Sequence, residues 1–244
     1  MSRIISDPYF QVVTLSATSN PQRLIYQALR QDYSEGDVSG EFSKSEKEYG
    51  ELCVKHLLTG GKGHFGPLEH PQITLNCIGF PHDVPMQART HRVGISFDIQ
   101  SSRYSGQRFV DVASGDREVE SVFYARPAGV YNDRSGNKAF YTEEMRFNDL
   151  EFAREGCRIY RDRIEAGVAP EAARHFIVQG FRQNFVVSFN LRSALHFLDL
   201  RSKADAQPEI QAFSDLLLGR LACWCPEIVG WYESARLHKA LLAP

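Results

Sequence analysis

Apolar side chains recur along this chain with the spacings of both strands and helices. Alternating or β-branched apolar runs predict strands over residues 9–16, 72–80 and 184–191. Apolar positions at helical spacing predict a short helix over 84–92, an amphipathic tail over 226–240, and longer helices over 21–30, 43–59, 139–166, 171–179, 193–200 and 208–223. Clustered Gly, Asp, Asn and Ser predict a long loop or hairpin over 107–138. We therefore expect an α+β fold, in which one domain over 1–244 has a central sheet flanked by several long helices.

Composition limits the class of protein. A chain of 244 residues with 43% hydrophobic residues can bury a sizeable core. The formal net charge of −2 argues against a broadly basic nucleic-acid-binding surface, so any anion site must be local. No apolar run approaches the roughly 18 residues that span a bilayer, and residues 1–7 lack a signal-peptide pattern. We expect a cytoplasmic protein that binds neither nucleic acid nor membrane.

The five cysteines are scattered at positions 53, 77, 157, 223 and 225, which is not the pattern of a disulfide framework. Cys223 and Cys225 lie too close together, with no partners nearby, for a zinc site, so no metal site is expected. Cys225, followed by proline, is a possible nucleophile. The alternative is favoured, because residues 216–225 have the composition of a buried helix, in which cysteine is a small hydrophobe.

The most informative chemistry lies in two neighbouring stretches, 87–92 and 96–106. They contain three arginines, a histidine, a tyrosine and several hydroxyl side chains. Guanidinium groups match the paired oxygens of phosphates and carboxylates, and serine hydroxyls complete such anion sites. A solvated basic loop is the alternative, but Ile95, Phe97 and Ile99 among the polar residues favour partial burial. These stretches therefore predict a site for a phosphorylated ligand.

Three other segments are ambiguous when each is taken alone. Residues 66–70 form a polar turn containing Glu69 and His70. Glu171 and Arg174, at i and i+3, have the spacing of an ordinary ion pair on a helix surface. Arg192 and His196 lie four apart on one helical face, while Leu195, Leu198 and Leu200 are expected to pack inward.

The stretch from 87 to 105 resembles the motif R-H-R-x-x-S-x-N-x-x-S-x-R-Y of the flavin-dependent thymidylate synthases. His91 and Arg92 match its H-R, and its later positions match Ser96, Asp98 (in place of Asn), Ser101, Arg103 and Tyr104. Two departures are visible. Three residues rather than two separate Arg92 from Ser96, and Thr90 intervenes between Arg89 and His91, so either Arg89 or Thr90 takes the place of the first arginine.

Three further segments resemble elements of the same family in the same order. They are P-x-E-H at 66–70, G-V-x-x-E-x-A-R at 167–174, and N-x-R-S-x-x-x-F-L-x-L-R at 190–201. The G-x-G-x-x-G string at 61–66 follows a predicted helix and precedes a polar turn, so it lacks the strand-to-helix context of a Rossmann motif, and the chain contains no P-loop. A flavin must therefore bind by another arrangement, as it does in this family.

The resemblance implies an enzyme that uses FAD. In the implied reaction, FAD takes a hydride from NADPH and methylenetetrahydrofolate supplies a one-carbon unit to C5 of dUMP. The reduced flavin then completes the methyl group, which gives dTMP and tetrahydrofolate. This route needs no side-chain nucleophile, because the flavin performs the redox chemistry. The resemblance also implies a homotetramer whose sites are shared between subunits.

The resemblance assigns roles residue by residue. Arg201 is the catalytic candidate, because it would stabilise the charge that makes C5 nucleophilic; otherwise it is a plain arginine at a helix C-terminus. The residues implied for dUMP are Gln87, Arg89, Ser101, Ser102, Arg103, Arg174 and Arg201. Those implied for FAD are His70, Thr90, His91, Arg92, Asp98, Asn190, Arg192 and His196. The alternatives are a non-catalytic sensor of nucleotide phosphate and a single-strand binder that stacks bases on Phe97 and Tyr104.

Overall fold

The computed structural model describes residues 5–40, 43–60, 64–132 and 135–239. Predictions for residues 1–4 and for residue 240 of the amphipathic tail lie outside these ranges. The chain divides into two compact units. Unit 1 comprises Met1–Gln11, Cys77–Ala88 and Asp98–Phe185, and unit 2 comprises Val12–Asn76, Arg89–Phe97 and Val186–Pro244. The mixture of helix and sheet confirms the α+β class, while the single domain over 1–244 stays a prediction.

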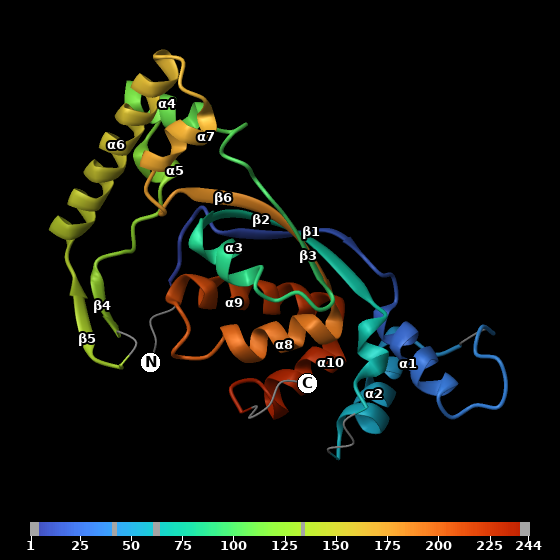
Figure 1. The fold of residues 1–244 in the computed structure, drawn as a ribbon. Helices are drawn as coiled ribbons and strands as arrows, with labels where there is room; N and C mark the ends of the chain where they lie inside the picture. Colours follow the sequence, from blue (N-terminus) through green and yellow to red (C-terminus); the bar gives the residue numbers. More distant parts are fainter. Residues whose placement is uncertain (1–4, 41–42, 61–63, 133–134, 240–244) are drawn as a thin grey trace. The chain divides into compact units, whose positions relative to one another are not determined.

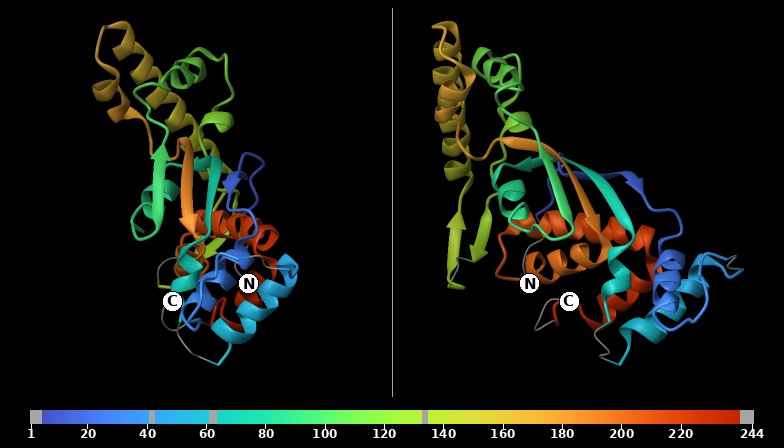
Figure 2. Two further views of the ribbon diagram at one scale, coloured as in Figure 1. Left: turned by 90° about the vertical axis from the view of Figure 1, so that its right-hand side faces the viewer. Right: turned by 45° about the vertical axis from the view of Figure 1, so that its right-hand side comes forward.

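A four-stranded sheet has the order β1-β2-β6-β3 (Figures 1 and 2). The strands are β1 (Gln11–Ala17), β2 (Gln72–Pro81), β6 (Arg182–Asn190) and β3 (Ile95–Ile99). The first three are confirmed within two residues. Apolar side chains of β2 and β6 are buried, whereas β1 buries only Val12 and exposes Val13 and Leu15. β3 was not predicted as a strand, and its side chains are at most half-buried.

Unit 2 contains α1 (Pro21–Gln31), α2 (Glu46–Cys53) and, as Figure 1 shows, α8 (Leu191–Arg201) beside α9 (Pro208–Trp224) and α10 (Pro226–Ala235). The predicted helix over 43–59 forms as α2 and a π-helical turn over Val54–Leu58. Phe197 of α8 packs edge-on against Phe189 of β6 and Phe213 of α9, which fixes α8 in the core. Leu200 was expected inside but is 38% exposed, because it lies on the outer side of the last turn of α8.

Unit 1 contains two helices that the sequence analysis missed, α4 (Gln107–Ser114) and α5 (Val119–Val122). The prediction of a loop over all of 107–138 is therefore wrong, although β4 (Gly129–Asn132) and β5 (Lys138–Tyr141) form the hairpin. The longest helix, α6 (Glu143–Glu165), begins after β5, and its Phe147 is 63% exposed. α3 (Asp83–Ala88) ends four residues before the predicted helix over 84–92 would.

The helix predicted over 171–179 is short. It consists of α7 (Pro170–Ala173) and one 3₁₀ turn over Arg174–Phe176. The chain leaves the helical conformation at Ile177. This segment packs closely against Gly156 of α6. A Cβ at that position would lie 2.6 Å from the Phe176 carbonyl oxygen. The close approach of α6 to this backbone therefore requires glycine.

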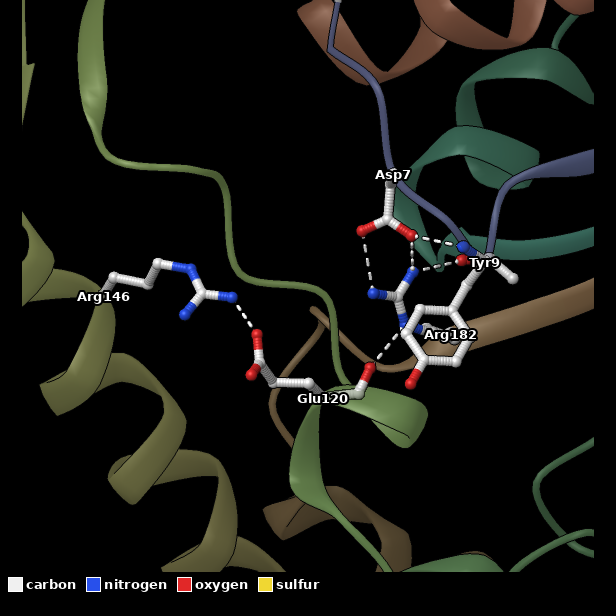
Figure 3. A network of polar contacts seen from close by, with 6 residues as sticks. Asp7, Tyr9, Glu120, Arg146 and Arg182 are labelled. Carbon is white, nitrogen blue, oxygen red and sulfur yellow. Dashed lines mark hydrogen bonds and ion pairs between the residues drawn. The ribbon is translucent and has the colours of Figure 1, made fainter.

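A buried arginine at the start of β6 connects four segments of unit 1 (Figure 3). Arg182 is 5% exposed and donates from Nη1 and Nη2 to the Asp7 carboxylate at 3.0 and 2.9 Å. It also donates to the carbonyl oxygens of Gly79 at 2.9 Å and Glu120 at 2.8 Å. The guanidinium lies over the Tyr9 ring, 4.4 Å from its centroid, and the Glu120 side chain pairs with Arg146. Each of the three guanidinium nitrogens of Arg182 thus donates to at least one acceptor, as a buried cation requires.

Candidate functional site

The family motif over 190–201 begins at the corner between β6 and α8, in unit 2. The Asn190 side chain accepts a hydrogen bond from the Ser193 backbone N–H at 2.8 Å, so it caps the helix and α8 begins at Leu191. The Asn190 N–H in turn donates to the Gly94 carbonyl at 3.0 Å. Gly94 has φ +64°, and a Cβ there would lie 2.3 Å from Asn190 Nδ2 and from Ser193 Oγ. The extra residue after Arg92 is therefore accommodated by a left-handed glycine packed on this cap.

Arg201, at the last position of α8, contacts the loop that follows α3. Its Nε donates to His91 Nε2 at 3.0 Å and its Nη2 donates to Thr90 Oγ1 at 3.2 Å. The motif over 87–105 and the motif over 190–201 therefore meet at this guanidinium, between residues 110 positions apart. Thr90 rather than Arg89 lies against Arg201, while Arg89 is exposed.

The surroundings of His91 favour its neutral form. The ring packs edge-on against Phe197, with centroids 5.0 Å apart, and against His196 at 5.8 Å. Burial, Arg201 and His196 lower the pKa of His91 from 6.5 to about 4. Burial also lowers the pKa of Arg201, which nevertheless stays a cation at neutral pH. The site thus pairs a charged guanidinium with a neutral imidazole.

Other cationic side chains of unit 2 lie along the start of α8 and the adjoining loops. Arg192 Nη1 donates to Glu69 Oε1 at 2.6 Å, a contact that sequence analysis missed although Glu69 belongs to the P-x-E-H element. His70, next to Glu69, and Arg92 are exposed. Among the described residues, His196 Nδ1 is buried without a hydrogen-bond partner. These side chains supply donors and cations suited to an anionic ligand.

Unit 1 contains a second cluster, built on the turn that follows β3. The backbone N–H groups of Tyr104 and Ser105 donate to the Ser101 carbonyl at 3.1 and 3.2 Å, which closes the turn. Arg174 Nη1 donates to Ser102 Oγ at 3.3 Å, and Arg103 Nε lies 3.5 Å from Glu171 Oε2. The interpretation of Glu171 and Arg174 as a surface ion pair is therefore wrong, since Glu171 pairs with Arg103. Serine hydroxyls and two guanidinium groups gather here as a phosphate site requires.

The predicted site residues divide between the two units. Unit 1 holds Gln87 on α3, Asp98 on β3, and the cluster of Ser101, Ser102, Arg103 and Arg174. Unit 2 holds the remaining predicted residues, which are His70, Arg89, Thr90, His91, Arg92, Asn190, Arg192, His196 and Arg201.

Comparison with known proteins identifies the family. A family model described as "Thymidylate synthase complementing protein" matches residues 14–227. The flavin-dependent thymidylate synthase of Haloarcula marismortui is 34% identical, covering 96% of this chain and 99% of that protein. That of Halobacterium salinarum is 33% identical, covering 96% of this chain and all of the relative. The chain belongs to the flavin-dependent thymidylate synthase family. It is therefore an enzyme.

Solved structures show the same fold at lower identity. A UMP/dUMP methylase from Streptomyces cacaoi bound with 5-Br dUMP matches with a TM-score of 0.77 at 19% identity, covering 98% of each chain. A flavin-dependent thymidylate synthase from Helicobacter pylori, complexed with FAD and dUMP, matches with a TM-score of 0.65 at 19% identity, covering 90% of this chain and 97% of that one. The agreement covers both units of the chain.

Cys225, the cysteine considered as a nucleophile, is poorly suited to that role. Cys225 is fully buried, and burial raises its pKa well above the ordinary value, so its reactive thiolate is disfavoured. Cys223, expected to be buried, is exposed because α9 turns it outward, and all five cysteines are free. Within the parts of the chain that the structure describes, no three His, Cys, Asp or Glu side chains gather as metal ligands. No helix of those parts is long and apolar enough to cross a membrane.

Proposed function

We propose that this enzyme converts dUMP to dTMP, with methylenetetrahydrofolate as the carbon donor and NADPH as the reductant. In the overall balance, dUMP, methylenetetrahydrofolate, NADPH and a proton give dTMP, tetrahydrofolate and NADP⁺. The observation that carries the proposal is the contact of Arg201 with Thr90 and His91, which joins two motifs of the family in one cluster. The cytoplasmic location stays part of this proposal.

The phosphate end of dUMP is assigned to the cluster in unit 1. Arg174 and Ser102 are already hydrogen-bonded to each other, and Arg103 and Ser101 belong to the same turn region. Gln87 and Arg89 complete the proposed set. Binding of the phosphate is the same in the ground state and the transition state, so these residues should govern affinity. Arg201 is assigned to the pyrimidine, where negative charge develops and a preorganised cation lowers the barrier.

The flavin is assigned to the polar side chains around the start of α8. When bound, FAD supplies the hydride relay between NADPH and the transferred carbon. Arg92 is exposed and Arg192 pairs with Glu69, and both guanidinium groups suit the phosphate oxygens of FAD. In the same unit, His196 Nδ1 is buried without a hydrogen-bond partner among the described residues, so it can bond to a ligand. The full proposed set is His70, Thr90, His91, Arg92, Asp98, Asn190, Arg192 and His196.

The homotetramer is part of the proposal. Three phenylalanines of unit 1 are strongly exposed, namely Phe140 at 71%, Phe147 at 63% and Phe152 at 69%. Aromatic side chains are enriched in the buried centres of interfaces, so subunit contacts would cover them favourably. Sedimentation of the parent should give a tetramer, and Phe147→Glu with Phe152→Glu should shift it toward smaller species. A parent that sediments as a monomer would refute this part.

The roles of Arg174 and Arg201 can be separated kinetically. Arg174→Ala should mainly raise KM for dUMP, because it removes a phosphate ligand. Arg201→Ala should lower the rate at saturating dUMP by about 10²–10³, the usual effect of losing a preorganised donor. Both variants should still bind FAD and stay yellow. UMP, which differs from dUMP only by its 2′-hydroxyl, is the control substrate in the kinetic measurements of both variants. If Arg201→Ala turns over normally at saturation, the assigned role is wrong.

The non-catalytic nucleotide sensor that the sequence left as an alternative does not fit this family membership, because the relatives of this chain are enzymes.

A further inference from the structure

The Arg201 guanidinium donates to acceptors on two neighbouring residues of one loop. Its Nε donates to His91 Nε2 at 3.0 Å, and its Nη2 donates to Thr90 Oγ1 at 3.2 Å. Because a guanidinium is planar, two bonds from different nitrogens fix both its plane and its direction. We propose that Thr90 and His91 are positioning residues, which hold the Arg201 guanidinium in one orientation for its work on dUMP. This inference rests on the proposed function.

The bond to Arg201 requires a particular state of His91. An arginine Nε carries a proton and can only donate, so His91 Nε2 must present a lone pair. The ring is then neutral, with its proton on Nδ1. The groups that face the ring come from α8: the Arg201 cation, the titratable His196 and the apolar Phe197. All three disfavour a second positive charge, because a cation and an apolar neighbour both penalise protonation. Protonation would replace the acceptor by a donor and release Arg201.

Thr90 gives this chain an acceptor that the R-H-R pattern lacks. Thr90 stands directly before His91, where that pattern has an arginine. An arginine has five donors and no acceptor, so it could not accept a hydrogen bond from Arg201. The threonine hydroxyl accepts one at 3.2 Å. Thr90 is exposed, so substitutions there leave the core intact.

Paired substitutions at Thr90 test the kinetic consequence. Thr90→Val keeps the size of the side chain but removes the acceptor, while Thr90→Ser keeps the hydroxyl. In the flavin-loaded enzyme, Thr90→Val should lower kcat at saturating dUMP about tenfold, at the low end of the worth of a hydrogen bond to a charged group. Its KM for dUMP should change far less than its kcat. Thr90→Ser should restore kcat to near that of the parent, which a general effect on folding would not predict.

A second readout needs no turnover. In the flavin-free protein, ¹⁵N NMR should show the His91 ring neutral at pH 5 and protonated on Nδ1. Arg201→Ala should raise the pKa of His91, because it removes the nearby cation. If the parent makes no dTMP, the proposed function fails and this inference fails with it. If the parent makes dTMP, an unchanged kcat in Thr90→Val, or a His91 pKa near 6.5 in the parent, overturns this inference alone.

Discussion

Replacing Arg182 tests whether a buried ion pair holds unit 1 together. Arg182→Met keeps the length of the side chain but leaves the Asp7 carboxylate, 12% exposed, without its bidentate partner. Removing one member of a buried pair typically costs about 3–5 kcal/mol. The carbonyls of Gly79 and Glu120 also lose a donor, at about 1–3 kcal/mol for each that stays buried. We therefore expect the free energy of unfolding to fall by at least about 4 kcal/mol.

The matched control is Arg158→Met on α6. Arg158 pairs with Glu155 at 2.9 Å, and both side chains are about half exposed. Such a helix-surface pair contributes only about 0.2–0.5 kcal/mol. Urea denaturation followed by circular dichroism measures both variants, provided that the slopes agree. Because Asp7→Asn removes the stranded charge, the double variant with Arg182→Met should cost less than the sum of the single ones. Equal midpoints for Arg182→Met and Arg158→Met would show that the buried pair contributes no more to stability than the exposed one.

Three further predictions follow from the site. Gly94→Ala should lower the melting temperature and flavin retention more than Gly167→Ala, since both have positive φ but only Gly94 would push a Cβ into neighbouring atoms; equal effects would contradict this. Cys225→Ala and Cys223→Ala should keep the rate of dTMP synthesis within a few-fold of the parent rate. A covalent adduct of dUMP with either sulfur would instead show that a cysteine is the nucleophile. The fold lowers the pKa of His91 from 6.5 to about 4. Between these two pH values, the His91 ring is therefore protonated in the unfolded chain but neutral in the folded protein. The urea midpoint should therefore fall as pH drops through that window, and less steeply in the His91→Gln variant.

The sequence predicted β2 and β6 because apolar side chains alternate along β2, and Val and Phe are frequent in β6. β3 was missed because Ile95, Phe97 and Ile99 are only half-buried and stand among anion-binding residues. α4 was missed because glycine, serine and aspartate flank it, although Phe109 and Val112 have helical spacing and are buried. Turn-forming residues therefore outweighed a real but short helical signal.

The motifs predicted the residue types of the site but not their partners. Arg103 pairs with Glu171, Arg192 with Glu69, and Arg201 with His91. Each pair joins segments that are far apart in the chain, so no local spacing could reveal it. The helix spacing of Glu171 and Arg174 suggested a pair that does not form. Only the fold determines which cation meets which acceptor.

The activity proposed for this chain is the synthesis of dTMP by the flavin route. The most direct measurement is an anaerobic reaction of FAD-loaded protein with dUMP, NADPH and methylenetetrahydrofolate carrying ¹³C in its one-carbon unit, analysed by mass spectrometry. We expect dTMP that contains the label, and none when FAD, NADPH or the folate is left out. If the FAD-loaded protein binds dUMP but yields no labelled dTMP, the proposed activity is refuted.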